Sequence, residues 1–156
     1  MGGTVDIDEV SGCTCLRVRR AARRLTQLYD QALKPSGLTV NQFGVMANLF
    51  GAALHGEQFL PIGILAGRLS MHPTTLNRDL KPLLAQGLVA DMAKPRDRRM
   101  RAVGITRKGR TRFGAAIPLW REAQREVEAA LGAGGTRDLN ALLEAVAGQP
   151  RGPSGE

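Results

Sequence analysis

The side chains that could do chemistry are concentrated in one basic segment of the chain. Between Lys94 and Arg112 the sequence holds nine Lys or Arg residues and one Asp. This segment alone therefore carries a charge of +8, equal to the formal net charge of all 156 residues. Guanidinium and ammonium groups at this density bind phosphate oxygens. The partners that this chemistry favours are a nucleic acid backbone or an acidic membrane surface.

Patterns that support catalysis or metal binding are missing from the sequence. It contains no phosphate-binding loop, no His or Cys pair at metal-ligand spacing and no nucleophile beside a base. His55 and His72 are isolated, and we expect His72 to cap a helix or contact the backbone. The glycine-rich stretch at 132–135 follows a predicted helix, which makes it a linker. We therefore expect neither an enzyme nor a metal or cofactor site.

Two cysteines, Cys13 and Cys15, stand at the amino-terminal end of the first predicted helix, near Arg17 and Arg19. A helix amino terminus and nearby cations both stabilise a thiolate, so these thiols are candidates for oxidation. Cysteines this close in a helix point in different directions, and we do not expect a disulfide between them. The alternative is that they are small packing residues.

The length suits one domain with a sizeable core, or one domain with a dimerisation arm. No apolar run approaches 18 residues and the amino terminus is Gly-rich and acidic, so we expect neither a membrane span nor a signal peptide. The protein is therefore expected to be cytoplasmic, with both cysteines as thiols. Residues 1–10 and 149–156 are expected to be disordered tails.

A helix-turn-helix followed by a hairpin is expected to position the basic segment. A short apolar helix from Pro61, a turn at 70–72 and a second helix from His72-Pro73 form the first part. Alternating residues at 88–92 and 100–105 indicate two strands, with the charges at the tip between them. This order describes a winged helix, a mainly α fold with a small sheet.

The helix that begins near Pro73 divides into two faces. An apolar face is formed by Leu76, Leu80, Leu83 and Gly87. The opposite face and its flanks are polar enough to enter the major groove of DNA, and their candidate contacts are Thr74, Thr75, Asn77, Arg78 and Lys81. Pro82 cannot donate to the carbonyl of Arg78, so a bend is expected there.

Further helices are predicted on both sides of this unit. Apolar residues at three- and four-residue steps predict a helix over 13–33, and Thr39 with Gln42 forms the capping box of the next one. A loop is expected over 51–58, with Phe59-Leu60 as a short strand against the hairpin. Downstream, a near-heptad seam follows Arg107 as far as Leu131, and a short amphipathic helix ends near Val146.

These motifs resemble the MarR family of bacterial transcription regulators. The resemblance covers roughly Cys13 to Val146, and its specific positions are the turn, Thr75, Arg78, Gly87-Leu88-Val89, Asp97-Arg98-Arg99 and Thr106-Arg107-Lys108-Gly109. The family's wing ends in an Asp-x-Arg pair, in which the arginine probes the minor groove and the aspartate braces it. The resemblance implies sequence-specific DNA binding rather than membrane binding, with wing contacts from Arg96, Asp97, Arg98 and Arg99.

The resemblance also implies a homodimer built from the first helix and the last two. One protomer would span 11–148, with a DNA-binding lobe at 37–106 and dimerisation helices at 11–36 and 107–148. Apolar stripes on these helices exceed what one compact winged helix buries, which agrees with a dimer. Two recognition helices about 34 Å apart would match a pseudo-palindromic operator in double-stranded DNA.

Regulators of this family are often repressors, and a small molecule that releases the DNA is expected here. A small aromatic or phenolic compound is the candidate effector. Its pocket is expected between the dimerisation arm and the DNA-binding lobe, lined by Val18, Ala22, Phe43, Met46 and Trp120.

One branch of the family, the organic hydroperoxide regulators, offers a redox alternative. Those proteins carry a peroxide-sensing cysteine near the start of this helix and a tyrosine fourteen residues later, which Cys15 and Tyr29 reproduce, with Cys13 nearby. Val40 and Phe43 stand where that branch has two more tyrosines, so the hydrogen-bonding set is incomplete. Two further alternatives are a nonspecific architectural DNA-binding protein and a winged helix used as a protein-interaction module.

Overall fold

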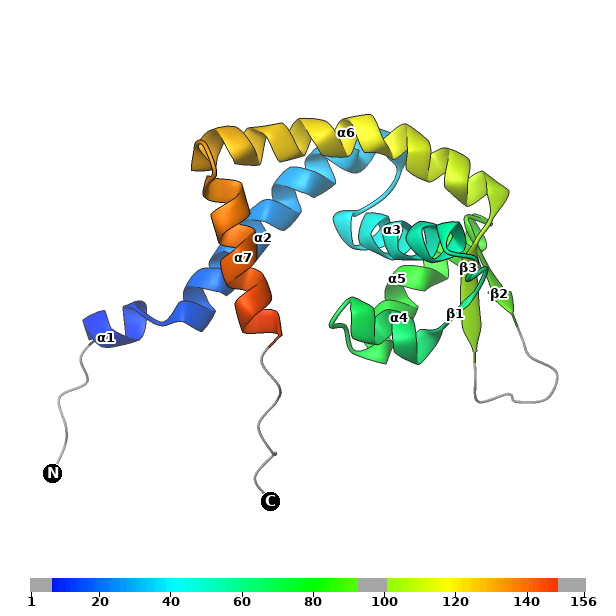
Figure 1. Cartoon of the computed structure of the whole chain (residues 1–156), viewed down its shortest axis with the longest axis horizontal. Helices are drawn as coiled ribbons and strands as arrows, with labels where there is room; N and C mark the ends of the chain where they lie inside the picture. The colour runs from blue at the N-terminus through cyan, green and yellow to red at the C-terminus, as the bar shows by residue number, and fades with distance from the viewer. Residues whose placement is uncertain (1–6, 93–100, 149–156) are drawn as a thin grey trace, which may run out of the picture. The chain divides into compact units, whose positions relative to one another are not determined.

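The computed structural model describes residues 7–92 and 101–148 of the chain. In these ranges helices dominate, with three short strands between them (Figure 1). The elements are α1 (Ile7–Ser11), α2 (Thr14–Leu33), the 3-10 turn η1 (Lys34–Ser36), α3 (Val40–Leu54), β1 (Leu60–Pro61), α4 (Ile62–Arg68), α5 (Pro73–Ala85), β2 (Val89–Met92), β3 (Ala102–Ile105), α6 (Arg107–Leu131) and α7 (Gly135–Ala147). The predicted mainly α fold with a small sheet is confirmed.

The strands form one antiparallel sheet in the order β1-β3-β2. Val89 pairs with Ile105 and Met92 with Ala102, so β2 and β3 make the predicted hairpin. β1 pairs with β3 through Leu60 and Val103, which confirms the expected short strand with a shift of one residue. Gly104 lies so close to the preceding loop that a Cβ there would collide with the carbonyl oxygen of Gln58.

The core of the first compact unit, which ends at Trp120, joins α3, α4 and α5 to the sheet. Its fully enclosed side chains include Met46, Leu65, Leu76, Leu80 and Val103. Burying each such side chain stabilises the fold by about 1.5–3 kcal/mol. The second unit begins at Arg121 and contains the end of α6 and all of α7.

Local signals predicted the start of α3. The Thr39 hydroxyl accepts from the backbone N–H of Gln42 at 3.2 Å, and the Gln42 side-chain oxygen accepts from the N–H of Thr39 at 3.1 Å. This reciprocal pair satisfies two amide donors that the helix leaves open.

Three boundaries differ from the sequence predictions. Residues 7–11 form α1 rather than belonging to a disordered tail. α3 continues to Leu54, into the expected loop, because Ala52 packs in the core.

Gly87 is exposed instead of sharing the apolar face, because it has a left-handed φ of 67° and ends α5. The N–H of Gly87 donates to Leu84 O and that of Leu88 to Leu83 O, the pairing of a Schellman motif.

Candidate nucleic-acid interface

Helix α5 presents the two faces that its sequence predicts. Leu76, Leu80 and Leu83 are completely buried in the core. The side chains that turn away from the core are exposed at Thr74, Asn77, Arg78 and Lys81, and partly exposed at Thr75. Pro82 does not end the helix, which continues to Ala85.

The first turn of α5 is held by a cap and by the turn before it. Nδ1 of His72 accepts from the backbone N–H of Thr74 at 3.3 Å, which confirms the predicted capping role. Pro73 occupies the first helical position, where its missing N–H costs nothing. The preceding turn contains Ser70 at a φ of 50°, and the N–H of Met71 donates to Ala66 O at 2.9 Å. α4, this turn and α5 are therefore a helix-turn-helix.

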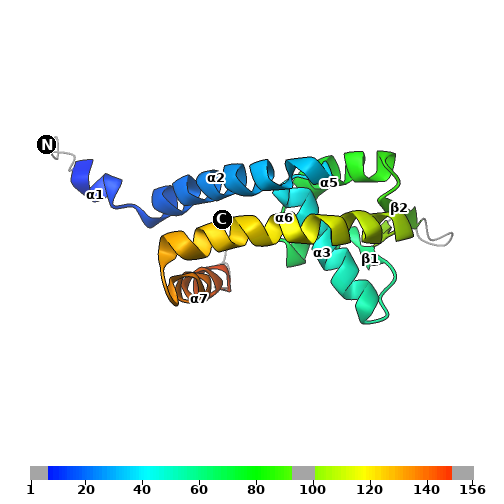
Figure 2. The same cartoon turned by 90° about the horizontal axis from the view of Figure 1, so that it is seen from above.

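Thr106 connects the hairpin to the carboxyl end of α5. Its hydroxyl donates to Gly87 O at 2.7 Å and accepts from the N–H of Gly109 at 3.0 Å, so one side chain binds the end of α5 and caps α6. A Cβ on Gly109 would collide with Leu88 O. The side-chain amine of Lys108 donates to Gln86 O at 2.8 Å. The Thr-x-x-Gly sequence thus places the start of α6 beside β2 (Figure 2).

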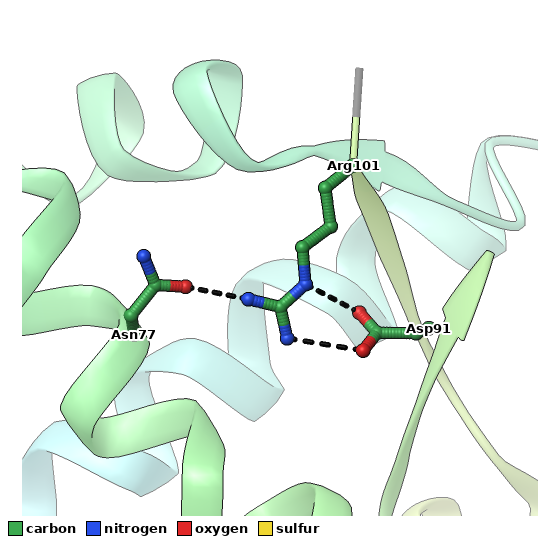
Figure 3. A network of polar contacts seen from close by, with 3 residues as sticks. All are labelled: Asn77, Asp91 and Arg101. Atoms are coloured by element: carbon green, nitrogen blue, oxygen red, sulfur yellow. Dashed lines mark hydrogen bonds and ion pairs between the residues drawn. The ribbon is translucent and has the colours of Figure 1, made fainter. Parts of the chain in front are cut away.

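Arg101 connects the hairpin to the exposed face of α5 (Figure 3). Its Nε and Nη2 donate to the two carboxylate oxygens of Asp91 at 2.8 and 3.0 Å. Its Nη1 donates to Oδ1 of Asn77 at 2.7 Å. Sequence reasoning placed Asn77 on DNA but missed Arg101 and Asp91. The sequence did offer a signal for this ion pair, because Arg101 and Asp91 stand at facing ends of two predicted strands.

The predicted wing contacts Arg96, Asp97, Arg98 and Arg99 lie outside the described residues. The wing-tip contacts therefore stay a prediction. Asp91, on the described part of the hairpin, binds Arg101 in a two-point ion pair.

The residues of the predicted effector pocket have different surroundings in the single chain. Met46 is fully enclosed in the core, and Phe43 stacks on Trp120 with ring centroids 6.0 Å apart. Val18 and Ala22 are exposed on α2. Two open cavities among the described residues have other linings, between Ala47 and Arg68 in one unit and between Gln124 and Asn140 in the other. Met46 and Phe43 are thus assigned to packing in the single chain.

Both cysteines are free and exposed, which does not support a packing role within one chain. Cys13 is the residue before the first turn of α2, and Cys15 lies in that turn. Tyr29 is half-buried on the same helix. A rise of 1.5 Å per residue separates Cys15 and Tyr29 by roughly 21 Å, so one chain cannot bring them into contact.

The described residues contain no group of three or more His, Cys, Asp and Glu side chains that could hold a metal ion. Among the same residues, no helix is long and apolar enough to cross a membrane.

An exposed recognition helix and a three-stranded wing define a winged helix-turn-helix protein. No protein-family profile matches the chain, and no curated protein matches it. Among solved structures, the M. tuberculosis transcriptional regulator MosR in complex with DNA is 40% identical, over 86% of this chain and 96% of that one, with a TM-score of 0.71. The chain belongs to the MarR family of transcription regulators, as its motifs predicted.

Two more distant structures show the same fold. A mutant of E. coli MarR complexed with operator DNA is 23% identical, over 92% of this chain and 99% of that one, with a TM-score of 0.75. The transcriptional repressor CouR, bound to a 23-mer DNA duplex, is 23% identical, over 93% and 99% of the two chains, with a TM-score of 0.76.

Proposed function

We propose that this protein is a sequence-specific DNA-binding transcription regulator that acts as a homodimer and represses its target. The observation that carries the proposal is the polar face of α5, which is exposed beside the hairpin while its opposite face is buried. MosR, which is 40% identical to this chain, was crystallised with DNA.

The exposed residues of α5 suit the two tasks of a DNA contact. Arg78 and Lys81 carry charges that reach phosphate or the acceptor edge of guanine, and Thr74 and Asn77 are short enough to lie against base edges. In the sequence, Arg96, Arg98 and Arg99 stand between the two hairpin strands, and we propose that they enter the minor groove with Asp97 as a brace.

Uncovered apolar side chains support the homodimer. Leu16 and Val18 on α2 are 54% and 40% exposed. On α7, Leu142 and Val146 are 67% and 66% exposed, with Leu143 at 38%. Apolar rows of this kind on both helices are explained by a second copy of the chain. We propose that residues 11–36 and 107–148 form the dimerisation arm and that residues 37–106 bind DNA.

Selection of bound sequences from random duplexes tests the proposal. The native protein should enrich one pseudo-palindromic sequence and bind it at least roughly 10³-fold more tightly than unrelated duplex. Equal affinity for all duplexes would instead identify a nonspecific architectural protein. No duplex binding at low salt would favour a protein-interaction module.

Redox sensing is a second candidate function, because Cys13 and Cys15 are exposed thiols at the start of a proposed dimerisation helix. An organic hydroperoxide would oxidise Cys15 to a sulfenic acid and be reduced to the alcohol. The enlarged polar group would disturb α2 and lower operator affinity.

Operator binding is compared with and without cumene hydroperoxide for the native protein, Cys15→Ser and Cys13→Ser. Native protein that stays bound while oxidised, or release of Cys15→Ser, contradicts this function.

A further inference from the structure

The amide of Asn77 is held in a single orientation by Arg101. A guanidinium group only donates hydrogen bonds, so the atom that faces Nη1 of Arg101 at 2.7 Å must be the amide oxygen. The chemistry excludes the flipped amide, which would place two donors against each other. Figure 3 shows the amide nitrogen of Asn77 on the side away from the guanidinium.

Arg101 is itself fixed by the hairpin. Asp91 accepts from it in a two-point contact, which sets the plane of the guanidinium as well as its position. The carbonyl oxygen of Arg101 accepts from the N–H of Ile62 at 2.9 Å, so the backbone of the residue is held at the start of α4. The orientation of Asn77 therefore depends on the hairpin, 24 residues further along the chain.

This orientation changes what Asn77 offers to a base. An asparagine that reads adenine donates to N7 and accepts from the N6 amine at the same time. Here the oxygen already accepts a charge-assisted hydrogen bond, and a base amine would have to share it with a guanidinium. The guanine edge presents only acceptors, N7 and O6, and needs only donors.

We propose that Arg101 is a positioning residue that makes Asn77 a hydrogen-bond donor toward DNA, so that the operator carries guanine rather than adenine at the base that Asn77 faces. The inference rests on the proposed DNA-binding function and adds to it a base preference and the residue that sets it. Its structural basis is the triad of Asn77, Arg101 and Asp91 across α5, β3 and β2.

The test is a base-by-base substitution scan of the selected operator with the full-length protein. The native protein should prefer guanine to adenine by about tenfold at one position in each half-site. Asn77→Ala should abolish this preference. Asn77→Asp should abolish it too, because its carboxylate still pairs with Arg101 but has no donor for guanine.

Arg101→Met and Arg101→Lys separate positioning from a simple charge contact. Both should reduce the guanine preference to about twofold or less, because neither side chain can hold Asp91 and Asn77 with one planar fork. If Arg101 only contacts phosphate, Arg101→Lys will retain native affinity and base preference. Arg137→Met, which removes one exposed charge on α7, is the matched control and should leave the preference unchanged. Thermal unfolding of each variant verifies the fold.

Failure of the proposed DNA-binding function and failure of the base preference set by Arg101 give different results in this test. If the native protein enriches no sequence, the proposed function is wrong and the base preference is wrong with it. If an operator is selected but its guanine preference survives in Asn77→Ala or Arg101→Lys, or the scan finds adenine at that position, this inference alone is overturned.

Discussion

At the scale of single residues, two glycines of α6 illustrate opposite demands of packing. A Cβ on Gly109 would collide with the carbonyl oxygen of Leu88, whereas a Cβ on Gly114 would meet nothing within 4 Å. The family motif Thr-x-x-Gly is thus explained by the close approach of α6 to the backbone that follows α5.

Gly109→Ala should therefore lower the free energy of unfolding by about 2 kcal/mol or more, because backbone must move to admit the methyl group. Gly114→Ala in the same helix should instead raise it by about 0.5–1 kcal/mol, since alanine favours the helix. Denaturant unfolding measures both. Equal effects of the two substitutions would show that α6 relaxes away from Leu88.

Among the described residues of α5, Arg78 offers the most direct test of whether a side chain contacts a base or a phosphate. Arg78→Ala should relax the base preference at one operator position and cost about 1–3 kcal/mol of binding free energy on the selected sequence. Fluorescence anisotropy titrations on the operator and on substituted operators measure this. A uniform loss of affinity for every sequence would assign Arg78 to phosphate instead.

At the scale of elements, Thr106 joins three segments through one hydroxyl. It caps α6 and binds the carbonyl oxygen of Gly87, which fixes the distance between the hairpin and the end of α5. Since the proposed DNA contacts come from α5 and the wing together, this link bears on binding as well as on stability.

Thr106→Ala should lower the free energy of unfolding by about 1–2 kcal/mol, because it removes a helix cap and leaves backbone groups without a partner. Thr111→Ala is the control, since its exposed hydroxyl donates to Arg107 O within the same helix. Denaturant titrations of the two variants compare them. A Thr106 variant as stable as the Thr111 variant would contradict the capping role.

At the scale of the whole molecule, the described chain leaves apolar rows uncovered on α2 and α7. We propose that a second copy of the chain covers these rows. DNA affinity then depends on dimerisation, because two half-sites are bound by two recognition helices.

Leu143→Asp should dissociate the dimer, because it places an unpaired charge in the proposed interface. Sedimentation velocity should show a monomer, and operator affinity should fall with it. The matched control is Leu54→Asp, at an exposed position at the end of α3, which should leave the dimer intact. If the Leu143 variant is still a dimer, the interface lies elsewhere.

Signals within a few residues of one another determined most of the fold from the sequence alone. The capping box at Thr39, the His72 cap and the apolar face of α5 follow from hydrogen bonds and periodicities that span one or two helical turns. The hairpin follows from alternation. These features depend on local geometry, which every chain of the same pattern shares.

Tertiary structure alone decided which distant groups meet. Arg101 and Asn77 are 24 residues apart, and no local pattern states that one would orient the other. Phe43 and Met46 pack in the core, and Gly109 lies against Leu88. Apolar periodicity predicts that a helix face is buried, but it does not predict which segment of the chain packs against that face. Many different segments could bury it equally well. Only the packed chain selects one of them, and with it the chemistry that Asn77 presents.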